Sequence, residues 1–151
     1  MNLELQVLAD LRRHEGCRLS AYRDTVGVWT IGYGRTKGVT PGMKITQEEA
    51  EADLRKDFLQ AWEDAKIVYK DLDKLDKVRQ SVLINMAFNL GRAKLRGFVG
   101  TIRFIAAGDY SNAALNMLDS LWARQVGQRA TELAKRMSTG KIEQKHLYIG
   151  E

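Results

Sequence analysis

A capped, regularly spaced helical segment begins at residue 46 and divides the chain into two parts of different character. Residues 46–49, TQEE, form a capping box, in which the threonine hydroxyl and the last glutamate satisfy each other's backbone amides. Apolar residues then recur every three or four positions over about five turns: Ala50, Leu54, Phe58, Ala61, Ala65 and Val68. The opposite face is strongly acidic, and the length predicts a helix that joins two lobes.

The part before this helix changes from helical to glycine-rich. Residues 2–14 have helical periodicity, and Gly16 is a natural stop. Residues 25–34, TVGVWTIGYG, predict a β-hairpin with Gly27 in the turn. Residues 39–45, interrupted by proline and glycine, predict a short third strand at the sheet edge.

The part after residue 71 is helical throughout. One helix is marked by Leu75, Val78, Val82 and Met86 and ends near Gly91, and others are expected over 98–107, 111–122 and 129–137. The predicted fold class is therefore α+β, with a small N-terminal β-containing lobe and a larger all-helical C-terminal lobe joined by a long helix. We expect one domain over 1–151. Its predicted parts are a β-hairpin lobe (14–47), a connecting helix (47–70) and a helical lobe (71–151, with the N-terminal helix 2–14).

Composition limits the cellular setting. The single Cys17 excludes an internal disulfide, so folding needs no oxidising compartment. The N-terminus lacks the pattern of a signal peptide, and no apolar run of about 18 residues is present. We expect a monomer that is made and kept in the cytoplasm. A target beyond the membrane would require a membrane-permeabilising partner for release.

The charge is unevenly distributed. The chain has a net charge of +5, with 7 Lys/Arg against 4 Asp/Glu in residues 1–45, 5 against 10 in 46–76, and 12 against 5 in 77–151. Basic regions attract polyanions such as nucleic acid, acidic membranes or cell-wall polymers, and charge alone does not choose among them.

Residues 12–36 bring two carboxylates and a threonine close together in the sequence. In a strand, Trp29, Ile31 and Tyr33 would share an apolar face, while Thr30 and the glycines at 32 and 34 would share a nearly bare one. A bare face allows a bulky ligand to lie against the backbone. The same sequence is also compatible with an ordinary strand in which the glycines only ease the twist of the sheet.

Hydrolysis of a glycosidic bond needs one carboxylic acid and one carboxylate. Glu15, at a helix end beside apolar residues, is suited to partial burial and the acid role. Asp24, in a polar turn, is suited to remain ionised. Acid pairs at this spacing are also common on solvated surfaces, so spacing alone leaves both interpretations open.

The pattern Glu15, Gly16, Leu19, Tyr22, Asp24, Gly27 and 30–34 (TIGYG) strongly resembles the phage-type lysozymes, the endolysin muramidases of glycoside hydrolase family 24. The resemblance covers almost the whole chain. Residues 46–54 resemble the start of the family's inter-lobe helix, and residues 84–91, INMAFNLG, its central helix.

The resemblance implies that Glu15 is the general acid and that Asp24 and Thr30 hold the attacking water, with inversion of the anomeric carbon. It implies that Arg129 pairs with Glu15 and orients it. It also implies substrate contacts along the cleft: Gly32, Gly34, Phe88, Asn89, Thr101 and Asn116. Considered alone, Phe88 would be a core residue, the two asparagines helix-surface residues and Arg129 a solvated charge.

Two departures from the family pattern are visible. Arg35 stands where the family usually has histidine after Thr-Ile-Gly-x-Gly, and the segment 36–45 is shorter than in longer members. We expect Cys17 to be a partly buried apolar residue and not a nucleophile. Trp62 and Trp122 are expected in the core. The two histidines, His14 and His146, do not form a set of metal ligands. No cofactor is expected.

The leading hypothesis is hydrolysis of β-1,4 bonds between N-acetylmuramic acid and N-acetylglucosamine in peptidoglycan, which would lyse a host cell. A lytic transglycosylase is the second hypothesis. That reaction needs only the acid, so the presence of both Asp24 and Thr30 favours hydrolysis. A basic helical nucleic-acid binder is the third, disfavoured because the basic residues are scattered over several helices. We expect peptidoglycan, and no nucleic acid, as the partner.

Overall fold

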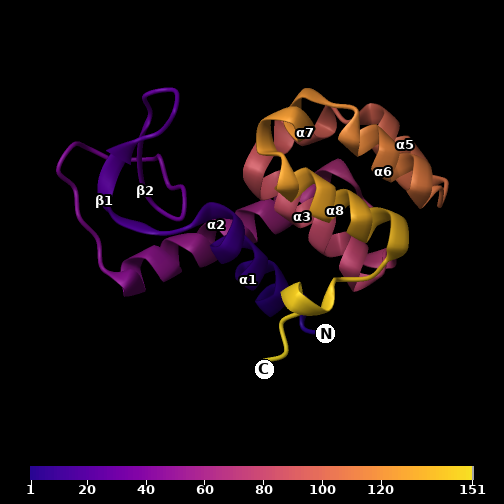
Figure 1. Cartoon of the computed structure of the whole chain (residues 1–151), viewed down its shortest axis with the longest axis horizontal. Helices are drawn as coiled ribbons and strands as arrows, with labels where there is room; N and C mark the ends of the chain where they lie inside the picture. The colour runs from indigo at the N-terminus through magenta and orange to yellow at the C-terminus, as the bar shows by residue number, and fades with distance from the viewer. Residues whose placement is uncertain (151) are drawn as a thin grey trace.

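The computed structural model describes residues 1–150, which form a helical body with a small two-stranded sheet at one end (Figure 1). The sheet contains β1 (Arg18–Arg23) and β2 (Trp29–Gly32), and α2 (Gln47–Val68) runs from the sheet to the other helices. The α+β fold class predicted from the sequence is confirmed. The lobe boundaries at 14, 47 and 71 stay predictions.

The N-terminal helix α1 (Leu3–Glu15) matches the predicted segment and ends at the first candidate site residue. Asn2 caps its start by accepting a hydrogen bond from the Leu5 amide (3.0 Å). Gly16 ends it with a φ of +66°, which an L side chain rarely adopts. Its buried face packs against α3 (Lys77–Leu90), so Glu15 projects from a helix that is anchored in the helical body.

The predicted hairpin is confirmed, and the prediction of a third strand is wrong. The two strands pair antiparallel with Tyr22 opposite Thr30, and Gly27 lies in the connecting turn with a φ of +85°. Residues 39–45 form no strand, because a segment interrupted by Pro41 and Gly42 meets β1 only near its end. There the Ala21 amide donates to the Met43 carbonyl and the Ile45 amide to the Leu19 carbonyl, both at 2.9 Å.

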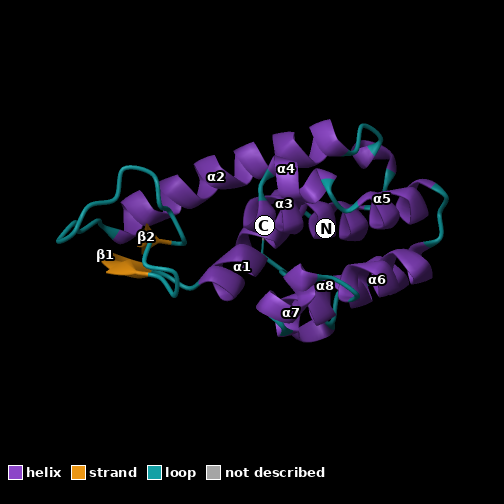
Figure 2. Ribbon diagram, turned by 90° about the horizontal axis from the view of Figure 1, so that it is seen from above, coloured by secondary structure: helices purple, strands orange, loops and turns teal. Residues whose placement is uncertain are grey.

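The long helix α2 is confirmed together with its cap. Thr46 Oγ1 accepts from the Glu49 amide (3.1 Å), and the Glu49 carboxylate accepts from the Thr46 amide (3.2 Å). The predicted apolar stripe is buried against β2 at one end and against α3 and α4 (Arg92–Arg96) at the other. Figure 2 shows α2 extending along the molecule from the sheet into the helices.

The helical body has more breaks than the sequence predicts. The helix expected to end near Gly91 is α3, which Asp76 caps at its start and Gly91 ends. A separate 3-10 turn, η1 (Leu72–Lys74), precedes it. The remaining helices are α5 (Val99–Ala106), α6 (Tyr110–Leu118), α7 (Leu121–Val126) and α8 (Gln128–Thr139), with a 3-10 turn η2 (Gln144–His146) near the end. Together with α1 and α3 they surround one hydrophobic core.

Candidate active site

Glu15 is held at the end of α1 by an ion pair from the far end of the chain. Nη1 of Arg129, the second residue of α8, donates to Glu15 Oε2 at 2.7 Å. Both side chains are largely buried, with 18% of Glu15 and 10% of Arg129 exposed. Nε of Arg129 donates to Asn85 Oδ1 on α3 (3.0 Å), so the guanidinium is fixed at two points. The expected pair between Glu15 and Arg129 is therefore present.

The other carboxylate oxygen of Glu15 lies against the backbone of Gly34. A Cβ placed on Gly34 would be 3.1 Å from Glu15 Oε1, and the residue has a φ of +93°. Oε1 receives no hydrogen bond from residues 1–150, so it is the oxygen available to a ligand. Glycine at position 34 therefore allows the carboxyl group and the chain after β2 to approach closely.

The prediction that Thr30, Gly32 and Gly34 share one bare strand face is wrong in part. Gly32 and Gly34 both have positive φ, so the alternation of strand faces stops at the end of β2. A Cβ on Gly32 would lie 3.3 Å from Ile45 Cδ1 and 3.7 Å from the Ala50 Cβ, which places it against the core beneath α2. Ile31 and Tyr33 are buried as predicted, but Thr30 is buried as well, at 4% exposed.

Asp24 and Thr30 both bond to the backbone of Val28, at the end of the hairpin turn. Asp24 Oδ1 accepts from the amides of Val26 (3.0 Å) and Val28 (2.8 Å), while Thr30 Oγ1 donates to the Val28 carbonyl (2.9 Å). The Asp24 amide donates to the same carbonyl at 2.9 Å. Asp24 Oδ2 stays free of hydrogen bonds from the described chain, and the turn orients it.

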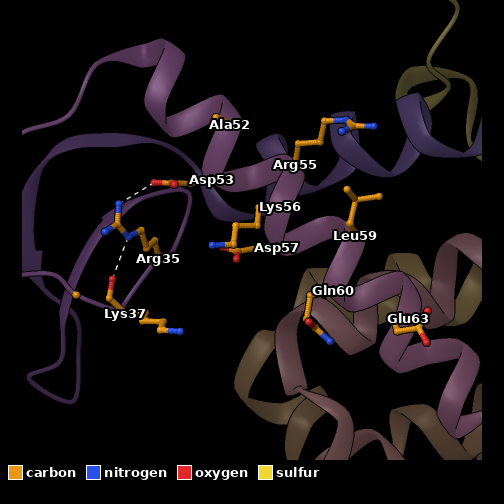
Figure 3. A pocket seen from close by; sticks show the side chains of 11 residues that line it. Arg35, Lys37, Ala52, Asp53, Arg55, Lys56, Asp57, Leu59, Gln60 and Glu63 are labelled. Atoms are coloured by element: carbon orange, nitrogen blue, oxygen red, sulfur yellow. Dashed lines mark hydrogen bonds and ion pairs between the residues drawn. The ribbon is translucent and has the colours of Figure 1, made fainter.

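Phe88 lies across a hollow from Gly34. This hollow, of about 210 Å³, is lined on the α2 side by Asp57 and Asp64 and on the α3 side by Phe88. A larger hollow of about 1030 Å³ lies along α2 and is also lined by Arg35 (Figure 3). The two hollows share Asp57 and Gln60. Gly34 lines the smaller hollow, and the residues that the two hollows share lie on α2.

Asp57 stands where the two hollows meet. Burial, reinforced by the charge of Asp53, raises the pKa of its carboxyl group. Arg35, the departure from the family pattern, donates to Asp53 Oδ2 (3.0 Å) and to the Lys37 carbonyl (3.0 Å). Figure 3 shows Arg35 turned toward Asp53, so the residue closes one end of the larger hollow.

Three expected contact residues bond to one another or to the core. Thr101 is 1% exposed and its hydroxyl donates to Asn116 Oδ1 (2.7 Å), so only the asparagine reaches a surface hollow, beside Phe98 and Ser120. Asn89 Oδ1 accepts from Nε1 of the buried Trp122 (2.6 Å). The structure does not bring this group to Glu15.

Other predictions have mixed outcomes. Trp122 is a core residue and Trp62 packs against Phe58 with ring centroids 5.5 Å apart, as predicted. Cys17, in the link between α1 and β1, is exposed, contrary to prediction. His14 is linked to both Asn85 and Glu132, a role that no signal in the sequence indicated.

A carboxyl group fixed by a guanidinium and a second carboxylate held in a turn are the two groups that a glycoside hydrolase of the lysozyme type requires. Residues 12–139 match the profile of the family described as Phage lysozyme, so the chain belongs to that family. No helix within residues 1–150 is long and apolar enough to span a bilayer.

Two relatives are similar over most of their length. The endolysin of Acyrthosiphon pisum secondary endosymbiont phage 1 is 32% identical over 129 residues, which cover 85% of this chain and 86% of that protein. The endolysin of Salmonella phage P22 is 33% identical over 129 residues, covering 82% and 85%. The SAR-endolysin of Escherichia phage P1 is 37% identical over 89 residues, or 59% of this chain and 48% of that protein, so the match spans about half of it.

Proposed function

We propose that this lysozyme hydrolyses the β-1,4 bond between N-acetylmuramic acid and N-acetylglucosamine in peptidoglycan and lyses the host cell. Glu15 protonates the glycosidic oxygen through Oε1. Asp24 and Thr30 hold the water that attacks the opposite face of the sugar, which inverts the anomeric carbon. The observation that carries the proposal is the fixed Glu15 Oε2, paired with Arg129 at 2.7 Å, with Oε1 left beside Gly34.

The two carboxyl groups are suited to different tasks. Glu15 is mostly buried and held by one guanidinium, so its geometry is set before substrate binds. Asp24 is held only through Oδ1, which leaves Oδ2 to accept a proton from water, and the Thr30 oxygen retains lone pairs for the same water. Sugar residues would lie in the hollow lined by Gly34 and Phe88. Further along the sugar chain, Asn116 would contact it from its own hollow, and Asn89 would do so through the NH2 group that Trp122 leaves free.

Product analysis of purified peptidoglycan digests tests the assignment. The parent should release reducing muramic acid ends whose first-formed anomer is α, seen by NMR. Glu15→Gln should lower the rate by at least about a thousandfold, and Asp24→Asn should also cripple the enzyme. Glu48→Gln, an exposed carboxyl group in the first turn of α2, is the matched control and should be fully active.

Each alternative has its own result. Anhydromuramic products by mass spectrometry would identify a lytic transglycosylase, and β product would refute inversion. Full activity of Glu15→Gln would refute the acid. Steep, salt-dependent binding to duplex DNA without lysis would instead identify a nucleic-acid binder.

The cellular setting belongs to the same proposal. The protein acts as a monomer, stays in the host cytoplasm after synthesis and reaches the wall through a lesion made by a holin-type partner. Size-exclusion chromatography with light scattering tests the monomer. Expression with and without a membrane lesion tests release, because lysis without any lesion would contradict this route.

A further inference from the structure

Glu15 and His14 are neighbours in the sequence, yet their side chains are joined by a longer route through the helical body. Arg129 donates from Nη1 to Glu15 (2.7 Å) and from Nε to Asn85 Oδ1 (3.0 Å). Asn85 Nδ2 lies 3.1 Å from His14 Nδ1, and His14 Nε2 lies 3.1 Å from Glu132 Oε1. The candidate acid is thus linked to a histidine through an arginine and an asparagine.

The arginine determines the direction of every other bond in this series. A guanidinium only donates, so the Asn85 atom that faces it must be the carbonyl oxygen. The other end of the amide, which faces His14, is then the NH2 group and can only donate. Nδ1 of His14 must therefore be the unprotonated acceptor, and Nε2 carries the hydrogen and donates to Glu132.

We propose that His14, as the neutral tautomer protonated at Nε2, and Asn85 are positioning residues that hold Arg129 and, through it, the acid Glu15. A second proton on His14 loosens this hold, so the enzyme contains a proton-sensitive support for its acid. This inference rests on the proposed function only in its effect on activity. The tautomer itself follows from the hydrogen bonds.

A proton on His14 Nδ1 would place a donor against the donor of Asn85. Turning the Asn85 amide over would relieve that contact, but it would then present NH2 to Arg129 Nε, again donor to donor. Either arrangement removes one hydrogen bond from a residue that is 1% exposed, where water cannot easily replace it. With the amide turned over, Arg129 would keep Glu15 as its only side-chain partner among residues 1–150.

The surroundings of His14 hold charges of both signs. Glu132 on α8 is the carboxylate in contact, and it also accepts from Arg13 on α1 (2.7 and 2.8 Å) and Arg136 on α8 (3.0 Å). The ring of His146, from η2, lies 3.7 Å from the same carboxylate. Arg13 and Arg136 also pair with Asp10, so two arginines face two carboxylates and the cluster is balanced without a charge on His14.

Nitrogen-15 NMR of the intact protein tests the tautomer directly. The chain has only two histidines, so the His14 ring signals are identified by comparison with His146→Gln. At the pH of full activity, we expect Nδ1 to show the shift of an unprotonated nitrogen and Nε2 that of a protonated one. The reverse pattern, or two protonated nitrogens at that pH, would overturn the proposal.

Two substitutions separate positioning from simple packing. His14→Asn places a carbonyl oxygen where Nδ1 stood and cannot take up a proton, so kcat should stay within about twofold and its acidic limb should move to lower pH. His14→Gln keeps a donor for Glu132 but leaves Asn85 without its acceptor. Its kcat should fall about tenfold to a hundredfold at unchanged KM, a range typical of lost support around a reacting group.

Controls make each result decisive. His146→Gln removes the other imidazole near Glu132 and should retain the parent kcat and pH profile. In the parent, the acidic limb of kcat should follow the protonation of His14 Nδ1 seen by NMR. Parent-like kcat and pH profile in both His14 variants would refute the positioning role. Full activity of Glu15→Gln would refute the proposed function instead, and the nitrogen shifts would still decide the tautomer.

Discussion

Replacing Arg136 by methionine should destabilise the protein more than any comparable change at its surface. Arg136 is 2% exposed and forms a two-point ion pair with Asp10, with Nη1–Oδ2 at 2.7 Å and Nη2–Oδ1 at 2.9 Å. Its Nη2 also donates to Glu132 at 3.0 Å. Methionine keeps most of the apolar stem but no donor, so the change removes the charge with little change in packing.

The expected loss follows from what Asp10 keeps. Removing one partner of a buried pair costs about 3–5 kcal/mol, because the other charge remains buried. Asp10, at 1% exposed, retains Arg13 Nη2 (3.0 Å) and Gln6 Nε2 (3.1 Å). Arg136 Nε is itself buried without a partner among the described residues, so its loss recovers a little. These terms favour the lower end, about 3 kcal/mol.

Urea unfolding at neutral pH measures this loss as a fall in midpoint at unchanged m-value. Arg12→Met is the matched control, because Arg12 pairs with Glu51 at 2.9 Å while 41% exposed. An exposed pair of this kind contributes about 0–1 kcal/mol. A loss below about 1 kcal/mol for Arg136→Met, equal to that of the control, would refute the claim that the buried pair supports the fold.

Three further predictions concern the acid, the ion cluster and the long helix. Gly34→Ala should lower kcat, because the new Cβ would lie 3.1 Å from Glu15 Oε1. Gly42 also has a positive φ, of +81°, but a Cβ there would meet open space. Gly42→Ala should therefore cost the same backbone strain, about 1–3 kcal/mol, and leave kcat unchanged. Burial would raise the pKa of Glu132, but hydrogen bonds from Arg13 and His14 outweigh it and hold that pKa below its ordinary 4.5. The stabilisation from Glu132 is therefore complete above about pH 4.5 and falls as the pH drops toward the lower folded value, so Glu132→Gln should flatten the acid-side loss of stability seen in urea unfolding. Thr46→Ala removes the cap of α2 and should cost about 1 kcal/mol in the same measurement. Ser138→Ala, near the end of α8, removes only a hydroxyl that donates to the Lys135 carbonyl and should cost less.

Local signals predicted the parts of this fold that depend on neighbours in the sequence. The capping box at Thr46, the helix end at Gly16 and the turn at Gly27 each depend on residues within a few positions. The third strand failed because pairing depends on how many residues of the segment actually reach β1, which Pro41 and the left-handed Gly42 reduce. The outcome was decided by how much of the segment contacts β1, and not by the β-propensity of its residues.

The candidate site shows the same limit. Glu15, Asp24 and Thr30 could be singled out because they lie in one short segment with recognisable chemistry. The role of Arg129 needed the family resemblance, since 114 residues separate it from Glu15. Asn85 and His14 gave no signal at all, because a polar residue inside an apolar helix and a histidine at a helix end are usually satisfied locally. Their importance comes only from the hydrogen bonds that the fold creates.

The two halves of the candidate site are held by different parts of the chain. Glu15 is fixed by Arg129 and Asn85, which belong to α8 and α3 of the helical body. Asp24 and Thr30 are fixed by the backbone amide and carbonyl of Val28 inside the hairpin. Packing in the helical body therefore orients the acid, whereas the hairpin turn orients the water-holding groups. Because α2 connects the two, a change in the angle between sheet and helices would alter the distance between acid and water without disturbing either set of hydrogen bonds.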